Sequence, residues 1–277
     1  MRRCGQTGYG QSTAIAAADV LALDLKQLDQ PTALRMLEEI AGHNAAFAKS
    51  AETERIQLYE ATGGNPLLLR WTAAQVGSGP CTSIRDALDH LRSRPPEQSP
   101  LAFIFDHVVD SLSATEVSLL VALTWPSQAI PVEAITEIAG TALEESRTAL
   151  KFLTNRSLVI PDQKEKHYRL VPLVADFLRN KKPEVIAATG SRLEQRALEL
   201  IFEHGFRNYD RFPLLEAAWP SVVPALPLLL TGPNDRLQEV CNAIGVFLDY
   251  TGRYDEKLAF SHEAEGIAVA AEIGRAS

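Results

Sequence analysis

One segment has the residue spacing of a phosphate-binding loop. Residues 5–12 read GQTGYGQS and match GxxxxGK[ST], except that Gln11 replaces the lysine that bridges the terminal phosphates of ATP. Such a loop also needs a buried strand before it, and residues 1–4 contain no apolar run. We therefore expect a flexible glycine-rich segment. The alternative, a complete nucleotide-binding enzyme using residues 5–12, predicts ATP turnover.

Other reactive side chains lie in no pattern that marks a catalytic or metal site. The chain has six histidines and three cysteines, without an HExxH, CxxC or GxSxG motif. The adjacent carboxylates Glu38-Glu39 and Glu144-Glu145 would point about 100° apart on a helix, so they would not share a substrate. We predict that the chain is not an enzyme by itself and has no metal of its own.

Composition places the chain among ordinary globular proteins. It has 277 residues, 46% apolar and 22% charged, with a formal net charge of -8. The odd cysteine count argues against a disulfide framework and predicts a cytoplasmic location. The longest late apolar stretch, residues 222–230, contains Pro224 and Pro227 and is about half the length of a membrane span, so no membrane partner is expected.

The positions of proline, glycine and capping residues predict a mainly α chain in three regions. Residues 1–97 form the first, a helical subdomain. Apolar spacing and start signals predict its helices at residues 30–41, 51–61, 66–76 and 83–91.

The second region, residues 98–183, has the pattern of a winged helix. Ser113 with Glu116 predicts a capped helix to residue 123, Pro131 opens a second helix that ends at Gly140, and Thr141 with Glu144 opens a third. Two short extended runs, residues 157–160 and 167–171, follow with a polar turn between them and predict a β-hairpin.

The third region, residues 184–277, returns to helix. Residues 237–273 predict two antiparallel helices joined at Thr251-Gly252-Arg253, which is a helical hairpin. Such hairpins stack into repeat arrays whose concave faces bind proteins, so a protein partner is expected here.

Residues 58–76, LYEATGGNPLLLRWTAAQV, resemble the GxP motif of the STAND class of signalling ATPases, which includes the NB-ARC proteins. Gly64, Asn65 and Pro66 match its three positions. The resemblance implies that this loop and helix close over the adenine and ribose of ADP and that a winged helix follows. In many bacterial members tetratricopeptide repeats come next. Gly252 and Tyr254 fit that repeat, whereas Lys257 departs from it.

Two departures bear on nucleotide binding. Members of the class commonly carry Met-His-Asp at the end of the winged-helix hairpin, and the histidine contacts the β-phosphate of ADP. Leu170, Val171 and Pro172 stand here, and valine has no hydrogen-bond donor. His167 lies four residues earlier and is better interpreted as a hairpin histidine than as a substitute. In members of the class, a strand ending in an arginine called the first sensor lies shortly before the helices that lead to the GxP motif. Arg2 or Arg3 would stand at or near that position. The resemblance therefore implies that the nucleotide-binding core lies outside this chain.

The sequence therefore predicts the regulatory or sensor portion of a STAND-type signalling protein, with a helical lid, a winged helix and the start of a repeat array. ADP or ATP would bind only with a nucleotide-binding core from outside this chain. The alternative is a winged-helix transcription regulator that binds DNA. Residues 111–183 carry nine basic and eight acidic side chains, and this near-neutral balance disfavours nucleic acid as a partner.

Overall fold

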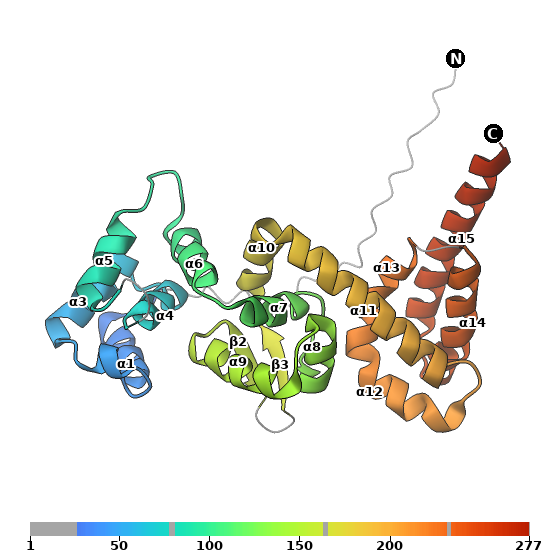
Figure 1. Ribbon diagram of the computed structural model, residues 1–277, viewed down its shortest axis with the longest axis horizontal. Helices are drawn as coiled ribbons and strands as arrows, with labels where there is room; N and C mark the ends of the chain where they lie inside the picture. The colour runs from blue at the N-terminus through green and yellow to red at the C-terminus, as the bar shows by residue number, and fades with distance from the viewer. Residues whose placement is uncertain (1–26, 78–80, 163–165, 232–233, 277) are drawn as a thin grey trace, which may run out of the picture.

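Helices dominate the computed structural model, in which a small three-stranded antiparallel sheet is the other regular structure of the described residues. The structure describes residues 27–77, 81–162, 166–231 and 234–276. The mainly α prediction is confirmed. Figure 1 shows residues 30–92 at one end of the molecule, the sheet with its helices in the middle, and residues 209–276 at the other end.

The first group of helices is built around its own apolar core. Its members are α1 (Gln30–Ala41), α2 (Ala45–Ala48), α3 (Glu52–Thr62), α4 (Pro66–Gln75) and α5 (Ile84–Arg92). Leu37, Phe47 and Leu58 are fully buried between them. The four predicted helices are confirmed with ends shifted by at most one residue. The four-residue α2 was not predicted, because it is too short to show a helical period.

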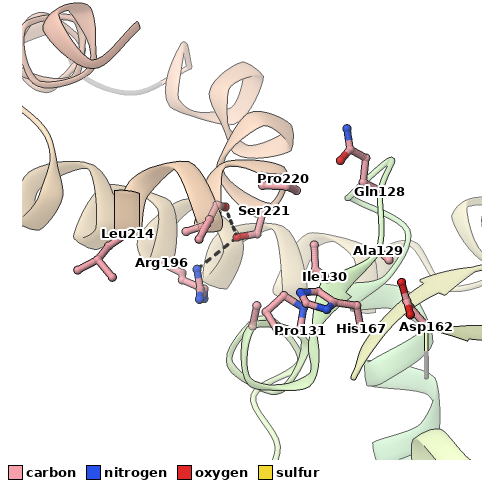
Figure 2. A pocket seen from close by; sticks show the side chains of 13 residues that line it. Gln128, Ala129, Ile130, Pro131, Asp162, His167, Arg196, Leu214, Pro220 and Ser221 are labelled. Carbon is pink, nitrogen blue, oxygen red and sulfur yellow. Dashed lines mark hydrogen bonds between the residues drawn. The ribbon is translucent and has the colours of Figure 1, made fainter. Parts of the chain in front are cut away.

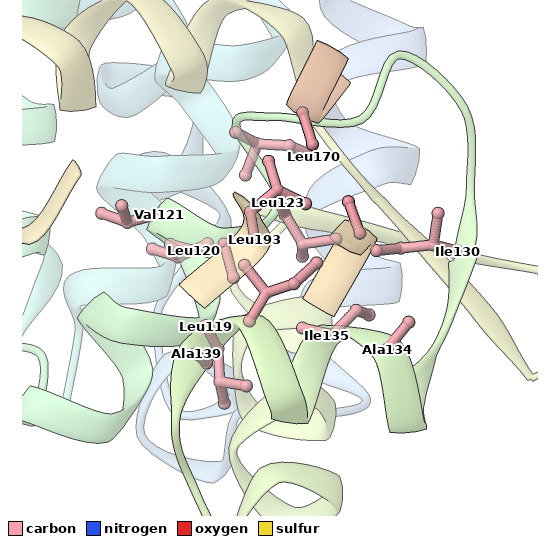
Figure 3. Close-up of a cluster of buried hydrophobic side chains, with 14 of the residues drawn as sticks. Leu119, Leu120, Val121, Leu123, Ile130, Ala134, Ile135, Ala139, Leu170 and Leu193 are labelled. Carbon is pink, nitrogen blue, oxygen red and sulfur yellow. The ribbon is translucent and has the colours of Figure 1, made fainter. Parts of the chain in front are cut away.

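The middle group has three helices and an antiparallel sheet, the winged-helix arrangement. Its elements are α7 (Ala114–Ala122), β1 (Ile130–Pro131), α8 (Val132–Ala139), α9 (Leu143–Asn155), β2 (Val159–Asp162) and β3 (His167–Leu170). The strands lie in the order β1-β3-β2, with Val159 opposite Leu170. Figure 3 shows Leu120, Ile135 and Leu170 meeting in the core beneath the sheet.

One predicted helix start of this region is confirmed and one is wrong. Ser113 and Glu116 form the reciprocal capping box that the spacing predicts. The box predicted at Thr141 and Glu144 is absent, because α9 begins one residue later, after Ala142, which has no capping side chain. The Thr141 hydroxyl instead lies 2.7 Å from that of Ser146, inside the first turn.

Two further boundaries differ from the prediction for backbone reasons. Pro131 does not open α8 but precedes it as the N-cap, because it pairs with His167 in the two-residue strand β1. Strand β2 begins at Val159 rather than at residue 157, because Ser157 has a left-handed φ of 57° and ends α9.

A helix that sequence analysis did not predict, α6 (Pro100–Asp110), connects the first two groups. Ser99 caps it, and its apolar face packs on α4, where Phe105 lies 5.3 Å from Trp71 between ring centroids. The buried side chain of Gln75 donates a hydrogen bond to the Ile104 carbonyl at 3.4 Å. Helix α6 therefore holds α4 against the winged-helix group.

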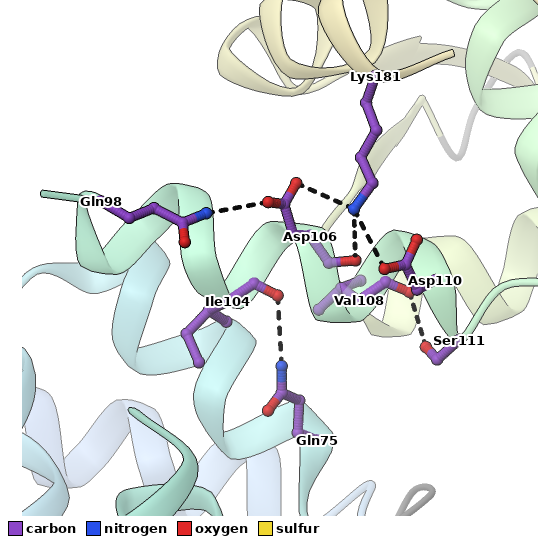
Figure 4. Close-up of polar contacts among 8 residues, drawn as sticks. All are labelled: Gln75, Gln98, Ile104, Asp106, Val108, Asp110, Ser111 and Lys181. Carbon is purple, nitrogen blue, oxygen red and sulfur yellow. Dashed lines mark hydrogen bonds and ion pairs between the residues drawn. The ribbon is translucent and has the colours of Figure 1, made fainter. Parts of the chain in front are cut away.

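A charged cluster fixes the other side of α6. Lys181, at the end of α10 (Pro172–Lys181), forms ion pairs with Asp106 at 3.1 Å and Asp110 at 3.2 Å (Figure 4). Its ammonium group also donates to the Asp106 carbonyl. Lys181 thus links the end of α10 to the C-terminal half of α6.

Helix α11 (Pro183–His204) continues the same core into the C-terminal group. Its first half packs on α7 and α8, where Leu193 is fully buried and Trp125 donates to the Thr189 hydroxyl at 3.1 Å. Its second half packs on the helices that follow, and Ile201 is buried there. Consequently the cores on the two sides of residues 183–184 are continuous.

The C-terminal helices include the predicted hairpin. They are η1 (Tyr209–Arg211), α12 (Phe212–Val222), η2 (Val223–Ala225), α13 (Leu226–Leu229), α14 (Asn234–Tyr250) and α15 (Tyr254–Ala276). Helices α14 and α15 pack together across the predicted turn, where Gly252 has a φ of 72°. Arg253 joins α15 to α12 through an ion pair with Glu216 at 2.6 Å.

The helical stretch Tyr209–Leu229 is the one part of the described chain that is long and apolar enough to cross a membrane. Length and composition alone are weak support, since the core helix of a protein outside a membrane passes the same test. Its Phe212, Leu215 and Trp219 are buried inside the protein. The absence of a membrane partner stays a prediction.

His90 gives the junction between α5 and α6 a pH dependence. Its ring stacks on Phe103 at 4.7 Å and lies 4.4 Å from His107 between ring centroids. Burial, and then the charge of His107, lower the pKa of His90 below its usual range. The folded state therefore favours the neutral imidazole more strongly than the unfolded chain does.

We expect the protein to lose stability as the pH falls through this range. The unfolded state protonates first, so the contribution of His90 is complete above its unfolded pKa of about 6.5 and is lost progressively below it. The midpoint of thermal unfolding should fall between about pH 7.5 and about pH 5.5, and His90→Gln should reduce that fall. His262→Gln, on the exposed face of α15, is the control. An unchanged pH slope in His90→Gln would contradict the expectation.

Candidate nucleotide groove

The Gly64-Asn65-Pro66 loop is a helix start with a left-handed backbone before it. Gly63 and Gly64 have φ values of 58° and 72°, which side chains rarely allow. The Asn65 side-chain oxygen accepts hydrogen bonds from the backbone N–H groups of Leu67 and Leu68 at 3.1 and 2.9 Å. Pro66 occupies the first turn of α4, where its missing N–H costs nothing.

Gly64 also allows a close approach of two chain segments. A Cβ atom at this position would lie 2.5 Å from the carbonyl oxygen of Leu28 and 3.2 Å from the Tyr59 ring. The Leu28 N–H donates to the Gly64 carbonyl at 2.9 Å. The glycine therefore packs against the segment before α1, and Pro66 alone of the three motif residues lines the groove described next.

Asn65→Ala tests the local role of the loop. Loss of the cap leaves the N–H groups of Leu67 and Leu68 without their acceptor, so we expect a loss of about 1 kcal/mol in the free energy of unfolding. Asn65→Asp keeps an acceptor oxygen and should stay within a few tenths of a kcal/mol of the original protein. Urea unfolding measures both, and equal losses in the two variants would show that the cap is not what matters.

A groove of about 470 Å³ separates the start of α4 from the winged-helix group. Its lining is Met36, Pro66, Leu67, Arg70, Thr154, Ser157, Val159, Ile160, Pro161 and Val171. Pro66 and Val171 are far apart in sequence but belong to the same groove. The structure thus places in one groove two residues that sequence analysis singled out through the family resemblance.

Arg70 is the functional candidate that sequence analysis missed. It follows Pro66 by one helical turn, so both side chains lie on one face of α4 and line the groove. Its guanidinium donates a hydrogen bond of 3.1 Å to the hydroxyl of Ser157, across the groove on the winged-helix side. The i, i+4 spacing from Pro66 was the available signal, but Ser157 lies too far along the chain to be found from sequence.

His167 does not take the place of the family's histidine in this groove. It lines a separate pocket of about 560 Å³, between the sheet and helices α11 and α12, together with Asp162 and Arg196 (Figure 2). Arg196 forms an ion pair with Glu137 and donates to the Ser221 hydroxyl at 3.4 Å. This larger pocket shares no lining residue with the groove at Pro66 and contains none of Gly64, Asn65 and Pro66.

A DNA-binding winged helix would present the exposed side of α9 to a groove of the duplex. On this side of α9, carboxylates neutralise the charge of Arg147. Arg147 forms ion pairs with Glu144 at 2.6 Å and Glu133 at 3.7 Å. A guanidinium between two carboxylates is a poor phosphate ligand, since both partners would have to be displaced. No observation on this face favours DNA.

Several sequence predictions cannot be placed on the fold. The glycine-rich segment at residues 5–12 and the arginines Arg2 and Arg3 lie outside the described residues. Within the described part, no group of three or more His, Cys, Asp or Glu side chains could hold a metal ion.

Comparisons with known proteins leave the family open. No protein-family model matches the chain, and no curated protein matches it.

Proposed function

We propose that this chain is the regulatory or sensor portion of a STAND-type, ATP- or ADP-dependent signalling protein and is not catalytic alone. The observation that carries the proposal is the groove that contains both Pro66 and Val171. In this function, Pro66 and its neighbours contact the base and ribose of a nucleotide. A nucleotide-binding core outside the chain supplies the phosphate loop and magnesium ligands.

The packing around α4 supports a coupling role. One side of α4 lines the groove through Pro66 and Arg70, while Trp71 on the other side is buried against Phe105 of α6. A nucleotide in the groove would touch the helical lid and the winged helix at once. A change at the groove would therefore alter the fit between these two parts.

The C-terminal helices offer a surface for a protein partner. Large apolar side chains are exposed at one end of this group, where Tyr209 lies 6.0 Å from Tyr250 between ring centroids. Tyr250 and Tyr254 are 66% and 64% exposed, and Leu258 is 66% exposed on the next turn of α15. Exposed tyrosines with apolar neighbours are typical of protein-binding surfaces.

Nucleotide binding by the chain alone should be weak, because it supplies only part of the site. Binding that serves the function needs the core outside this chain, but the groove alone should still contact ADP weakly, with a Kd of about 1 mM, equivalent to about 4 kcal/mol, and ATP with magnesium should not be hydrolysed. Methyl-labelled protein would be titrated with ADP and observed by NMR. The shifts should be confined to methyl groups that line the groove, such as those of Met36, Val159 and Val171.

Pro66→Ala provides the critical comparison. It removes ring contact with the nucleotide and should weaken ADP binding several-fold, while Pro131→Ala, in the other pocket, should leave it unchanged. The proposal is wrong if ADP shifts no groove methyl group at about 10 mM, a concentration that would fill most sites of this affinity. It is also wrong if both proline variants bind ADP like the original protein.

A further inference from the structure

The guanidinium of Arg70 has no charged partner among the residues that the structure describes. No carboxylate of the described residues lies within ion-pair distance of it, and its hydrogen bond runs to the neutral hydroxyl of Ser157. Arg70 is also half-buried and is the one charged side chain in the lining of its groove. A half-buried cation without a counter-charge favours an anion from outside the chain.

Ser157 shows that the position of Arg70 is specified by the fold. Ser157 follows the last turn of α9 with a φ of 57°, a conformation in which glycine is the usual residue. A serine in this backbone conformation stabilises the fold less than a glycine would, but its hydroxyl accepts the hydrogen bond from Arg70. A second hydroxyl, on Thr154, lines the same side of the groove.

The remaining groove lining is apolar. Pro66, Leu67, Val159, Pro161 and Val171 supply hydrocarbon surface, and the cation stands among them. Such a groove fits a ligand with a flat or apolar body and an anionic group at one end.

We propose that Arg70 is the anion ligand of this groove and binds a phosphate group of a nucleoside phosphate. This inference rests on the proposed function, because the base and ribose are then placed against Pro66 and Val171. The planar guanidinium can hold a phosphate through two parallel hydrogen bonds. Charge-assisted bonds of this kind are stronger than the present bond to Ser157, so Arg70 exchanges or shares that partner when phosphate arrives.

The experiment follows the Arg70 side chain directly. The Nε–H resonance of Arg70, assigned by its loss in Arg70→Lys, would be recorded while the full chain is titrated with ADP, adenosine or inorganic pyrophosphate. We expect ADP and pyrophosphate to shift this resonance and adenosine to leave it in place. Adenosine and ADP should both shift the groove methyl groups of Val159 and Val171.

Variants of Arg70 measure how much this side chain contributes to the affinity for ADP. Arg70→Gln should weaken ADP binding at least tenfold and leave adenosine binding unchanged, and Arg70→Lys should recover part of the loss because it restores the charge. Arg92→Gln, on an exposed arginine at the end of α5, is the matched control and should bind ADP normally. Thermal unfolding of each variant checks that the fold is intact.

The outcomes separate this inference from the proposed function. If ADP shifts the groove methyl groups but Arg70→Gln binds it equally well, Arg70 is not the ligand and the proposed function stands. If pyrophosphate shifts Arg70 while neither ADP nor adenosine shifts a groove methyl group, the anion site stands and the nucleotide function is wrong. If no probe shifts Arg70, the inference is overturned.

Discussion

Gly64→Ala should destabilise the protein by about 3 kcal/mol, the sum of a steric clash and a strained backbone. The added methyl group would lie 2.5 Å from the Leu28 carbonyl oxygen, which is main chain and cannot rotate away. The φ of 72° adds a cost of about 1–2 kcal/mol for a residue with a Cβ atom. The loop before Pro66 would have to move, and the motif would lose its position at the groove.

Gly252→Ala is a matched control for this prediction. Gly252 has the same φ of 72°, but a Cβ atom there would meet nothing within 4 Å. We expect it to cost about 1–2 kcal/mol, which is the backbone strain alone. Urea unfolding of both variants isolates the steric part as their difference. Equal losses would mean that the contact between Gly64 and Leu28 contributes nothing to stability.

Trp71→Ala should cost more, about 3–5 kcal/mol, because it empties a fully buried site. Trp71 extends from α4 into the core shared by α6 and the winged-helix group, where it packs on Phe105. Phe105 in turn stacks on Phe177 of α10 at 4.7 Å between ring centroids. The cavity would therefore loosen the contact between the helical lid and the winged helix.

Trp71→Phe measures how much of this packing a smaller aromatic ring retains. The indole nitrogen of Trp71 is buried and has no hydrogen-bond partner among the described residues, so its removal leaves no acceptor unpaired. We expect a loss clearly smaller than that of Trp71→Ala, in the range of about 1–2 kcal/mol for the lost ring volume. Similar losses in the two variants would show that a phenyl ring restores none of the packing that the indole provides.

These two positions also affect the proposed coupling in different ways. Gly64 fixes the loop that bears Pro66, and Trp71 fixes α4 to the winged-helix core. Weakened ADP binding in Trp71→Phe without a large loss of stability would indicate that the groove depends on the fit between the lid and the winged helix. The groove lies between these parts, so its walls are rigid only when both contacts are intact.

Local chemistry was enough to predict most of the helices. Asn65 and Pro66 mark the start of α4 by capping and by a preset φ, and Ser113 with Glu116 does the same for α7. These signals act over three or four residues, so they depend little on the rest of the fold. The start of α4 was therefore placed correctly from sequence.

Other local signals were overridden by the fold. Thr141 and Glu144 have the spacing of a capping box, but Thr141 bonds to Ser146 and α9 starts after Ala142. Pro131 has the preferred φ of a first helical turn, yet it pairs with His167 in the sheet. At Thr141 the contact with Ser146 replaces the predicted capping bond, and at Pro131 the pairing with His167 replaces the predicted first helical turn.

What the sequence determined by itself is the mainly α chain and helix starts such as that at Asn65 and Pro66, because capping and apolar period are short-range properties. Only the tertiary structure decided which face of α4 lines a groove and which side chains oppose it. The bond from Arg70 to Ser157 spans 87 positions, and Val171 lines the same groove as Pro66 although the two are far apart in the chain. Such contacts depend on how whole helices pack, and that information is spread over the entire core.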